Sequence, residues 1–130
     1  MTNVITRVSH FTLLVSNQEE ALAFYRDKLG FKVHTDAMFG ELRWLTISTE
    51  FDPHFEIALM LPGPENEGFV GKQAGSYPLL AFETKDCVAT YNELKAKGIV
   101  FNGEPKTESW GTGVSFHDLY GNMIYISQPV

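Results

Sequence analysis

The sequence predicts an α+β fold made of two βαβββ modules, and three observations support this prediction. Residues 10–29 and residues 79–97 share one pattern: an apolar strand, a polar capping turn and an amphipathic helix. Each helix then ends at a glycine that is followed by an apolar residue. The apolar strand EIALMLP at 56–62 also matches MIYISQP at 123–129. An internal repeat of this kind predicts that the same supersecondary unit occurs twice.

The first module begins with VSHFTLLV at 8–15, an apolar, β-rich run that is typical of a strand covered on both faces. A helix is expected next, because Ser16 and Glu19 have the spacing of a capping box. Gly30 supplies the left-handed residue that ends such a helix. Strands are then expected at about 31–38, 42–48 and 55–61.

The second module repeats this order, with Asp86 as the expected helix cap and Gly98 as the stop. Its later strands are expected at about 100–104 or somewhat longer, 113–117 and 123–128. The segment at 62–78 is rich in glycine and proline, which predicts a loop and not a helix or strand. We therefore expect a single domain in which module one spans about 4–62, a linker or lid about 63–77, and module two about 78–130.

Composition and charge narrow the possible partners. A chain of 130 residues with 44% hydrophobic and 20% charged residues fits one compact domain. Its single cysteine cannot form a disulfide within the chain, and the first residues lack the pattern of a signal peptide, so a cytoplasmic location is expected. No apolar run approaches the length of a membrane span, and a net charge of −6 with scattered basic residues argues against nucleic acid.

Two segments carry a family resemblance: FYRDKLGFKV at 24–33 and FHDLYGNMIYISQP at 116–129. With the paired βαβββ pattern, they make the chain similar to the vicinal oxygen chelate superfamily, which includes glyoxalase I, extradiol dioxygenases and the bleomycin and fosfomycin resistance proteins. The resemblance implies an open, eight-stranded, barrel-like cup with its helices outside, and a homodimer. Because lyases, dioxygenases and pure binders share this fold, the fold alone does not determine the chemistry.

In the metal-dependent members of this family, the ligands come from the first and last strands of each unit. The resemblance places those positions at His10, Ala58, Leu79 and Tyr125. A catalytic divalent metal normally needs about three ligands from His, Asp, Glu or Cys, and alanine and leucine have no donor atom. We therefore expect no metal and no other cofactor. One alternative remains: a slip of two residues preserves the strand face and would bring Glu56 to His10 as a weak site.

His10 is the candidate catalytic residue. Alternation along its strand directs His10 and Thr12 toward the cup, and Leu13 and Val15 under the helix. In the cup, His10 would contact substrate or transfer a proton. The alternative is a histidine that only holds a hydrogen bond to Tyr125 or to the backbone.

Aromatic residues supply most of the predicted binding surface, since ligand sites are mostly apolar with few polar groups. The expected ligand-binding residues are His10, Trp44, Glu56, Ala58, Leu79, Trp110, Phe116 and Tyr125. By contrast, His34, His117 and Arg43 are expected at the surface, and Cys87 is expected as a small buried residue.

Two classes of function follow. The first is a protein that binds a small apolar or aromatic molecule without metal, as the resistance relatives do. The second is a lyase, isomerase or dioxygenase, which would use a weak metal site at His10 and Glu56 or a metal-free base. A structural protein without a ligand is the third choice.

Overall fold

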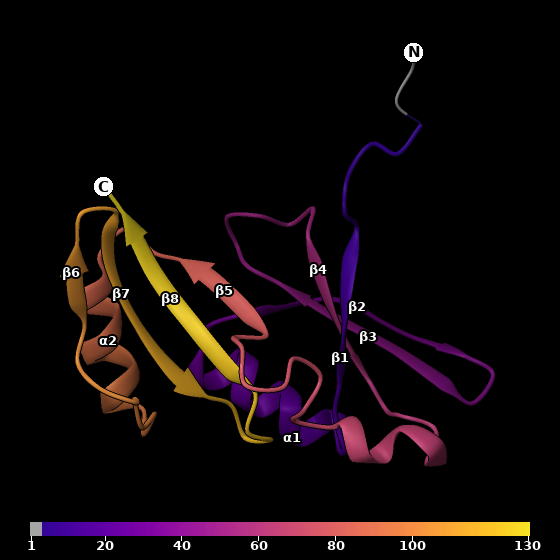
Figure 1. Cartoon of the computed structure of the whole chain (residues 1–130). Coiled ribbons are helices and arrows are strands. Elements are labelled where there is room, and N and C mark those ends of the chain that lie inside the picture. The colour runs from indigo at the N-terminus through magenta and orange to yellow at the C-terminus, as the bar shows by residue number, and fades with distance from the viewer. Residues whose placement is uncertain (1–3) are drawn as a thin grey trace. The chain divides into compact units, whose positions relative to one another are not determined.

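The computed structural model describes residues 4–130 and divides the chain into two compact units, with the boundary between Pro64 and Glu65 (Figure 1). This boundary falls inside the segment predicted as a linker. Each unit contains one four-stranded sheet and one main helix, in the order strand, helix and three strands. The predicted α+β class with two βαβββ modules is therefore confirmed. Within residues 4–130 the strands form two separate sheets and no closed eight-stranded barrel.

The first unit contains a sheet with the strand order β1-β4-β3-β2. Strands β1 and β4 are parallel, and the remaining neighbours are antiparallel. The helix continues without a break from an α-helical turn into a wider π-helical turn. The elements are β1 (His10–Leu14), α1 (Gln18–Leu22), the π-helical turn η1 (Ala23–Lys28), β2 (Lys32–Phe39), β3 (Leu42–Ser48) and β4 (Glu56–Met60).

The first helix begins one residue later than predicted. Asn17, and not Ser16, is the cap: its backbone is extended and its side chain accepts a hydrogen bond of 2.9 Å from the amide of Glu20. A cap must lie immediately before the first helical residue, which is Gln18, so Ser16 lies too early for this role. The predicted stop is confirmed, because Gly30 has a φ of 83° that other residues rarely adopt.

The helix side of the first sheet is the core of this unit. Leu13 and Val15 have no exposed surface, as the alternation along β1 predicted. Leu45, Ile47 and Tyr25 are also fully buried. The opposite face of the sheet therefore carries the other set of side chains, including His10 and Thr12, which are both exposed.

The second unit has the equivalent strand order, β5-β8-β7-β6, with β5 parallel to β8. Asp86 caps its helix as predicted, since its carboxylate accepts a hydrogen bond of 3.0 Å from the amide of Ala89. The elements are the 3₁₀ helix η2 (Pro64–Phe69), β5 (Leu80–Glu83), α2 (Cys87–Ala96), β6 (Lys106–Glu108), β7 (Gly111–His117) and β8 (Met123–Pro129).

Two expectations for this unit were wrong. The segment at 62–78 is not entirely a loop, because Pro64–Phe69 form the 3₁₀ helix η2. The strand expected at about 100–104 lies instead at Lys106–Glu108, and Phe101 contributes only an isolated bridge to Phe116. Pro105 has no backbone N–H, so a continuous ladder through this position is disfavoured.

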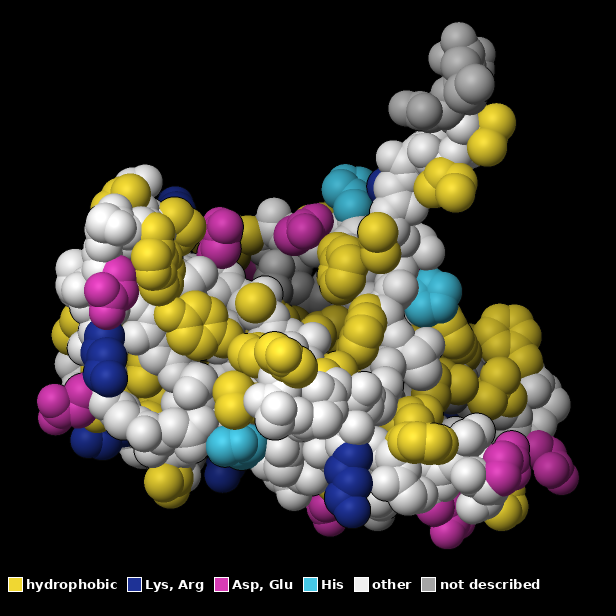
Figure 2. All heavy atoms as spheres, in the orientation of Figure 1, with side chains coloured by type: hydrophobic (Ala, Val, Ile, Leu, Met, Phe, Trp, Pro, Cys, Tyr) yellow, Lys and Arg dark blue, Asp and Glu magenta, His cyan; other side chains and the backbone are white. Residues whose placement is uncertain are grey.

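The described residues include no helix that is long and apolar enough to cross a bilayer. Hydrophobic side chains nevertheless reach the surface in both units, as the space-filling view shows (Figure 2). Val4, Ile5 and Val8 lie on the extended segment that precedes β1 and are 89%, 83% and 65% exposed.

Candidate functional site

The face of the first sheet opposite its helix carries a polar cluster centred on Glu56. Parallel pairing places Glu56 beside His10, whereas Ala58 lies beside Thr12. The structure thus has the two-residue offset that the sequence left open as an alternative. Ala58 is fully buried, and the Glu56 side chain is 20% exposed.

Two side chains hold the Glu56 carboxylate. The Thr46 hydroxyl donates a hydrogen bond of 2.6 Å to Oε1, and Nδ1 of His34 lies 3.0 Å from the same oxygen. Thr46 is fully buried on β3, and the His34 side chain is 35% exposed on β2. A carboxylate in this setting can accept a proton, bind a cation or orient an imidazole.

His34 reaches this cluster because of a β-bulge. The register between β2 and β3 shifts between Val33 and Thr35, so His34 is the additional residue on its strand. A bulge redirects a side chain in this way, and bulges are common near functional sites. We expected His34 at the surface, and it is exposed, but its contact with Glu56 was not predicted. No sequence signal in this stretch marks a bulge, which explains why its contact with Glu56 was missed.

His10 lies next to this cluster and contacts an aromatic ring. Its Nδ1 is 3.1 Å from the Ser9 hydroxyl oxygen. Its ring meets Trp44 edge to face, with 5.2 Å between the ring centroids and an angle of 89° between the planes. The first sheet therefore combines an aromatic pair with a carboxylate–imidazole pair on one face.

The second sheet carries its own aromatic pair on the corresponding face. The Trp110 and Tyr125 rings lie 6.2 Å apart between centroids, and Trp110 is 45% exposed. Tyr125 covers Gly113: a Cβ atom at that glycine would lie 1.9 Å from the tyrosine hydroxyl oxygen. The absence of a side chain at Gly113 is what allows this ring to lie against the sheet.

One predicted ligand-binding residue lies elsewhere. Phe116 is fully buried and its ring packs 5.3 Å from that of Phe101, on the face opposite Tyr125. It belongs to the hydrophobic core of the second unit because β7 alternates and places it on the helix side. Leu79 precedes β5, and its amide donates a hydrogen bond of 2.8 Å to the carbonyl of Met123. Because Ala81 pairs with Tyr125, alternation places Leu79 on the same face as Tyr125, as predicted.

The residues at the four family positions do not fit a catalytic metal. Ala58 and Leu79 have no donor atom. Across residues 4–130, no group of three or more His, Cys, Asp or Glu side chains is close enough to hold a metal ion. His10 and Glu56 are neighbours, but two ligands fall short of the set that catalytic sites normally provide.

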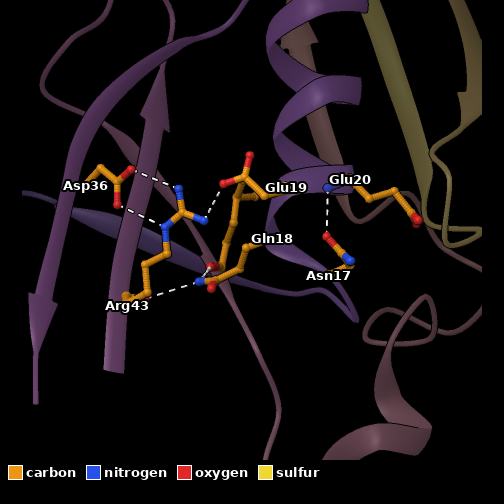
Figure 3. Close-up of polar contacts among 7 residues, drawn as sticks. Asn17, Gln18, Glu19, Glu20, Asp36 and Arg43 are labelled. Carbon is orange, nitrogen blue, oxygen red and sulfur yellow. Dashed lines mark hydrogen bonds and ion pairs between the residues drawn. The ribbon is translucent and has the colours of Figure 1, made fainter. Parts of the chain in front are cut away.

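Neither Arg43 nor Cys87 is placed to act on a ligand. The Arg43 guanidinium donates to Asp36 at 2.9 and 3.0 Å and to Glu19 at 2.6 Å (Figure 3). The hydrogen bond from Arg43 lowers the pKa of Asp36, and these partners already engage the arginine that a ligand anion would need. Cys87 is fully buried, and burial raises the pKa of its thiol, with the Asp86 charge adding to the effect. A buried thiol that resists ionisation is a poor nucleophile.

Residues 7–126 match the sequence profile of the Glyoxalase/Bleomycin resistance protein/Dioxygenase superfamily. The chain belongs to this superfamily. Its fold and the repeated signature segments agree with that assignment. The resemblance stated from the sequence is therefore confirmed.

Several known proteins resemble the chain over nearly its whole length. The structure of UcmS2 is 33% identical, covers 96% of this chain and 99% of its own, and has a TM-score of 0.85. TnmS3, an antibiotic-binding protein from Streptomyces sp. CB03234, is 29% identical with a TM-score of 0.82 and covers 99% of this chain and 100% of its own. An ethylmalonyl-CoA/methylmalonyl-CoA epimerase from Cereibacter sphaeroides is 29% identical and covers 96% of this chain and 99% of its own.

Proposed function

We propose that this protein binds a small apolar or aromatic molecule on the sheet faces that lie opposite its helices. The observation that carries the proposal is the pair formed by Trp110, in the turn before β7, and Tyr125 of β8, which lies over Gly113. A partly exposed aromatic pair provides a surface for another ring. His10 and Trp44 provide a similar surface on the first sheet. The similarity to TnmS3 supports the same class of function.

The two tryptophans allow each face to be tested separately. Trp44 and Trp110 are the only tryptophans in the chain and lie in different units. The Trp110→Phe and Trp44→Phe variants therefore each retain one tryptophan, whose fluorescence reports on its own unit. With 3-nitroanisole as a neutral, non-fluorescent aromatic probe, we expect saturable quenching of whichever tryptophan contacts the bound probe. Free tryptophan amide corrects for absorption by the probe.

Replacing Tyr125 with alanine is expected to weaken binding by about 1 to 3 kcal/mol, since the ligand loses contact with a large ring. The affinity for 3-nitroanisole would be measured by equilibrium dialysis. Tyr77→Ala is the matched control, because Tyr77 is 76% exposed and lies outside the aromatic pair. Unchanged affinity in Tyr125→Ala would remove this residue from the site. Failure to bind any compound in a panel of aromatic molecules of one to four rings would contradict the binding proposal itself.

An isomerase or lyase is the second candidate, and the observation that favours it is the Glu56 carboxylate beside two histidines. Such a carboxylate can act as a general base on a carbon acid. The epimerase relative suggests methylmalonyl-CoA as a substrate to test. Enzyme-dependent deuterium uptake from heavy water, lost in Glu56→Gln, would favour this candidate over simple binding.

We also predict that the purified protein retains no stoichiometric divalent metal, because His10 and Glu56 cannot compete with water as a two-ligand set. Elemental analysis would follow dialysis without chelator, repeated after adding Zn, Ni, Mn and Fe in turn. One retained equivalent per chain, lost in both His10→Ala and Glu56→Ala, would contradict the prediction and favour a metal-dependent enzyme.

A further inference from the structure

The polar cluster on the first sheet defines a hydrogen-bonding site in addition to the aromatic surface. Nδ1 of His34 lies 3.0 Å from Oε1 of Glu56 and 2.9 Å from the Thr35 hydroxyl oxygen. A neutral imidazole carries its proton on only one of its two nitrogens. A carboxylate oxygen at this distance would repel a lone pair on Nδ1 and attracts a proton there. The single N–H is then shared between the carboxylate oxygen and the Thr35 hydroxyl oxygen, and both oxygens accept it.

The carboxylate is itself held in place. The buried Thr46 hydroxyl donates to Oε1 of Glu56, so the oxygen that faces His34 has a fixed position. The bulge between Val33 and Thr35 fixes the backbone that carries the imidazole. In the neutral ring, a proton on Nδ1 leaves the lone pair on Nε2. The His34 side chain is 35% exposed, so a ligand can reach it.

We infer that His34 Nε2 accepts a hydrogen bond from a hydroxyl group of the ligand, and that the preferred ligands are hydroxylated aromatic molecules. The ligand is expected to contain an aromatic ring because Trp44 lies close to the polar cluster. Trp44 is two residues from Thr46 on β3. Its ring also contacts His10, which pairs with Glu56. Glu56 acts as a positioning residue that sets the imidazole tautomer. This inference rests on the proposed binding function and names the chemical class of its ligand.

The test compares 3-nitrophenol with 3-nitroanisole, which differ only in whether the ring oxygen carries hydrogen or methyl. At pH 7, where 3-nitrophenol is mostly protonated, the wild type is expected to prefer the phenol about threefold to tenfold, as one hydrogen bond provides. His34→Phe keeps a ring at this position and is expected to reduce that preference to about one. Glu56→Gln is expected to lower the preference in part. His54→Phe is the matched control, because His54 is an exposed histidine outside the cluster. This variant should keep the wild-type preference.

Each outcome is decisive. Binding of 3-nitroanisole with an equal preference in wild type and His34→Phe would overturn the inference and leave the binding function standing. Binding of neither compound, nor of the wider aromatic panel, would overturn the binding function itself. A ligand-independent measurement adds a second criterion: ¹⁵N NMR of the neutral His34 ring should show the proton on Nδ1. A proton found on Nε2 would overturn the inference whatever the binding data show.

Discussion

Replacing Phe116 with alanine is expected to lower the free energy of unfolding by about 3 to 5 kcal/mol, because the truncation leaves a cavity in a closely packed core. Phe116 has no exposed surface and its ring packs against Phe101, which in turn contacts Tyr91 of α2. Chemical denaturation followed by circular dichroism would measure the loss.

The control for this prediction is the same substitution at an exposed phenylalanine. Phe51 is 89% exposed, so Phe51→Ala is expected to change stability by less than about 0.5 kcal/mol. A milder variant, Phe116→Leu, should fold and still bind 3-nitroanisole if Phe116 lies outside the site. Equal losses in Phe116→Ala and Phe51→Ala would contradict the core assignment. Loss of binding in a folded Phe116→Leu would restore Phe116 as a ligand-binding residue.

The second large effect is expected at Gly71. Its φ of 79° is disfavoured for other residues, and a Cβ atom there would lie 1.9 Å from the backbone oxygen of Tyr120. Backbone atoms cannot move aside as a flexible side chain does. Gly71→Ala is therefore expected to destabilise the protein by about 2 to 4 kcal/mol, combining the cost of the left-handed backbone with displacement of the β7–β8 turn.

A substitution at Gly75 distinguishes the cost of the left-handed backbone from the cost of the clash with Tyr120. It has a similar φ of 63°, but a Cβ atom there would meet nothing within 4 Å. Gly75→Ala should therefore show only the backbone cost, about 1 kcal/mol. The difference between the two denaturation midpoints reports the clash with Tyr120. Similar losses in both variants would show that the segment does not pack on the turn at 118–122.

That turn shows how far local sequence can predict structure. The segment DLYGN was expected to close the last hairpin, and it does so through Asp118. The Asp118 carboxylate accepts hydrogen bonds from the amides of Tyr120 and Asn122, both at 2.9 Å. All the groups involved lie within five residues, so the sequence alone contains the information. Asp86 and Gly30 were predictable for the same reason.

Errors arose where the deciding interaction was not local. The strand at Lys106–Glu108 is placed by its pairing with β7, and β-propensity in the preceding residues could not reveal that register. Phe116 was predicted as a ligand-binding residue because the family resemblance places its strand in the cup. Alternation along β7 and packing against Phe101 place it in the core instead.

The sequence by itself determined the two modules, the family and the lack of donors at Ala58 and Leu79, because each depends on residue type and local order. Only the tertiary structure decided that Glu56 lies beside His10 and that His34 joins it. Strand register and a β-bulge bring these residues together, and both result from pairing between segments distant in the chain. The same holds for Tyr125 over Gly113, where a ring from β8 covers a glycine of β7.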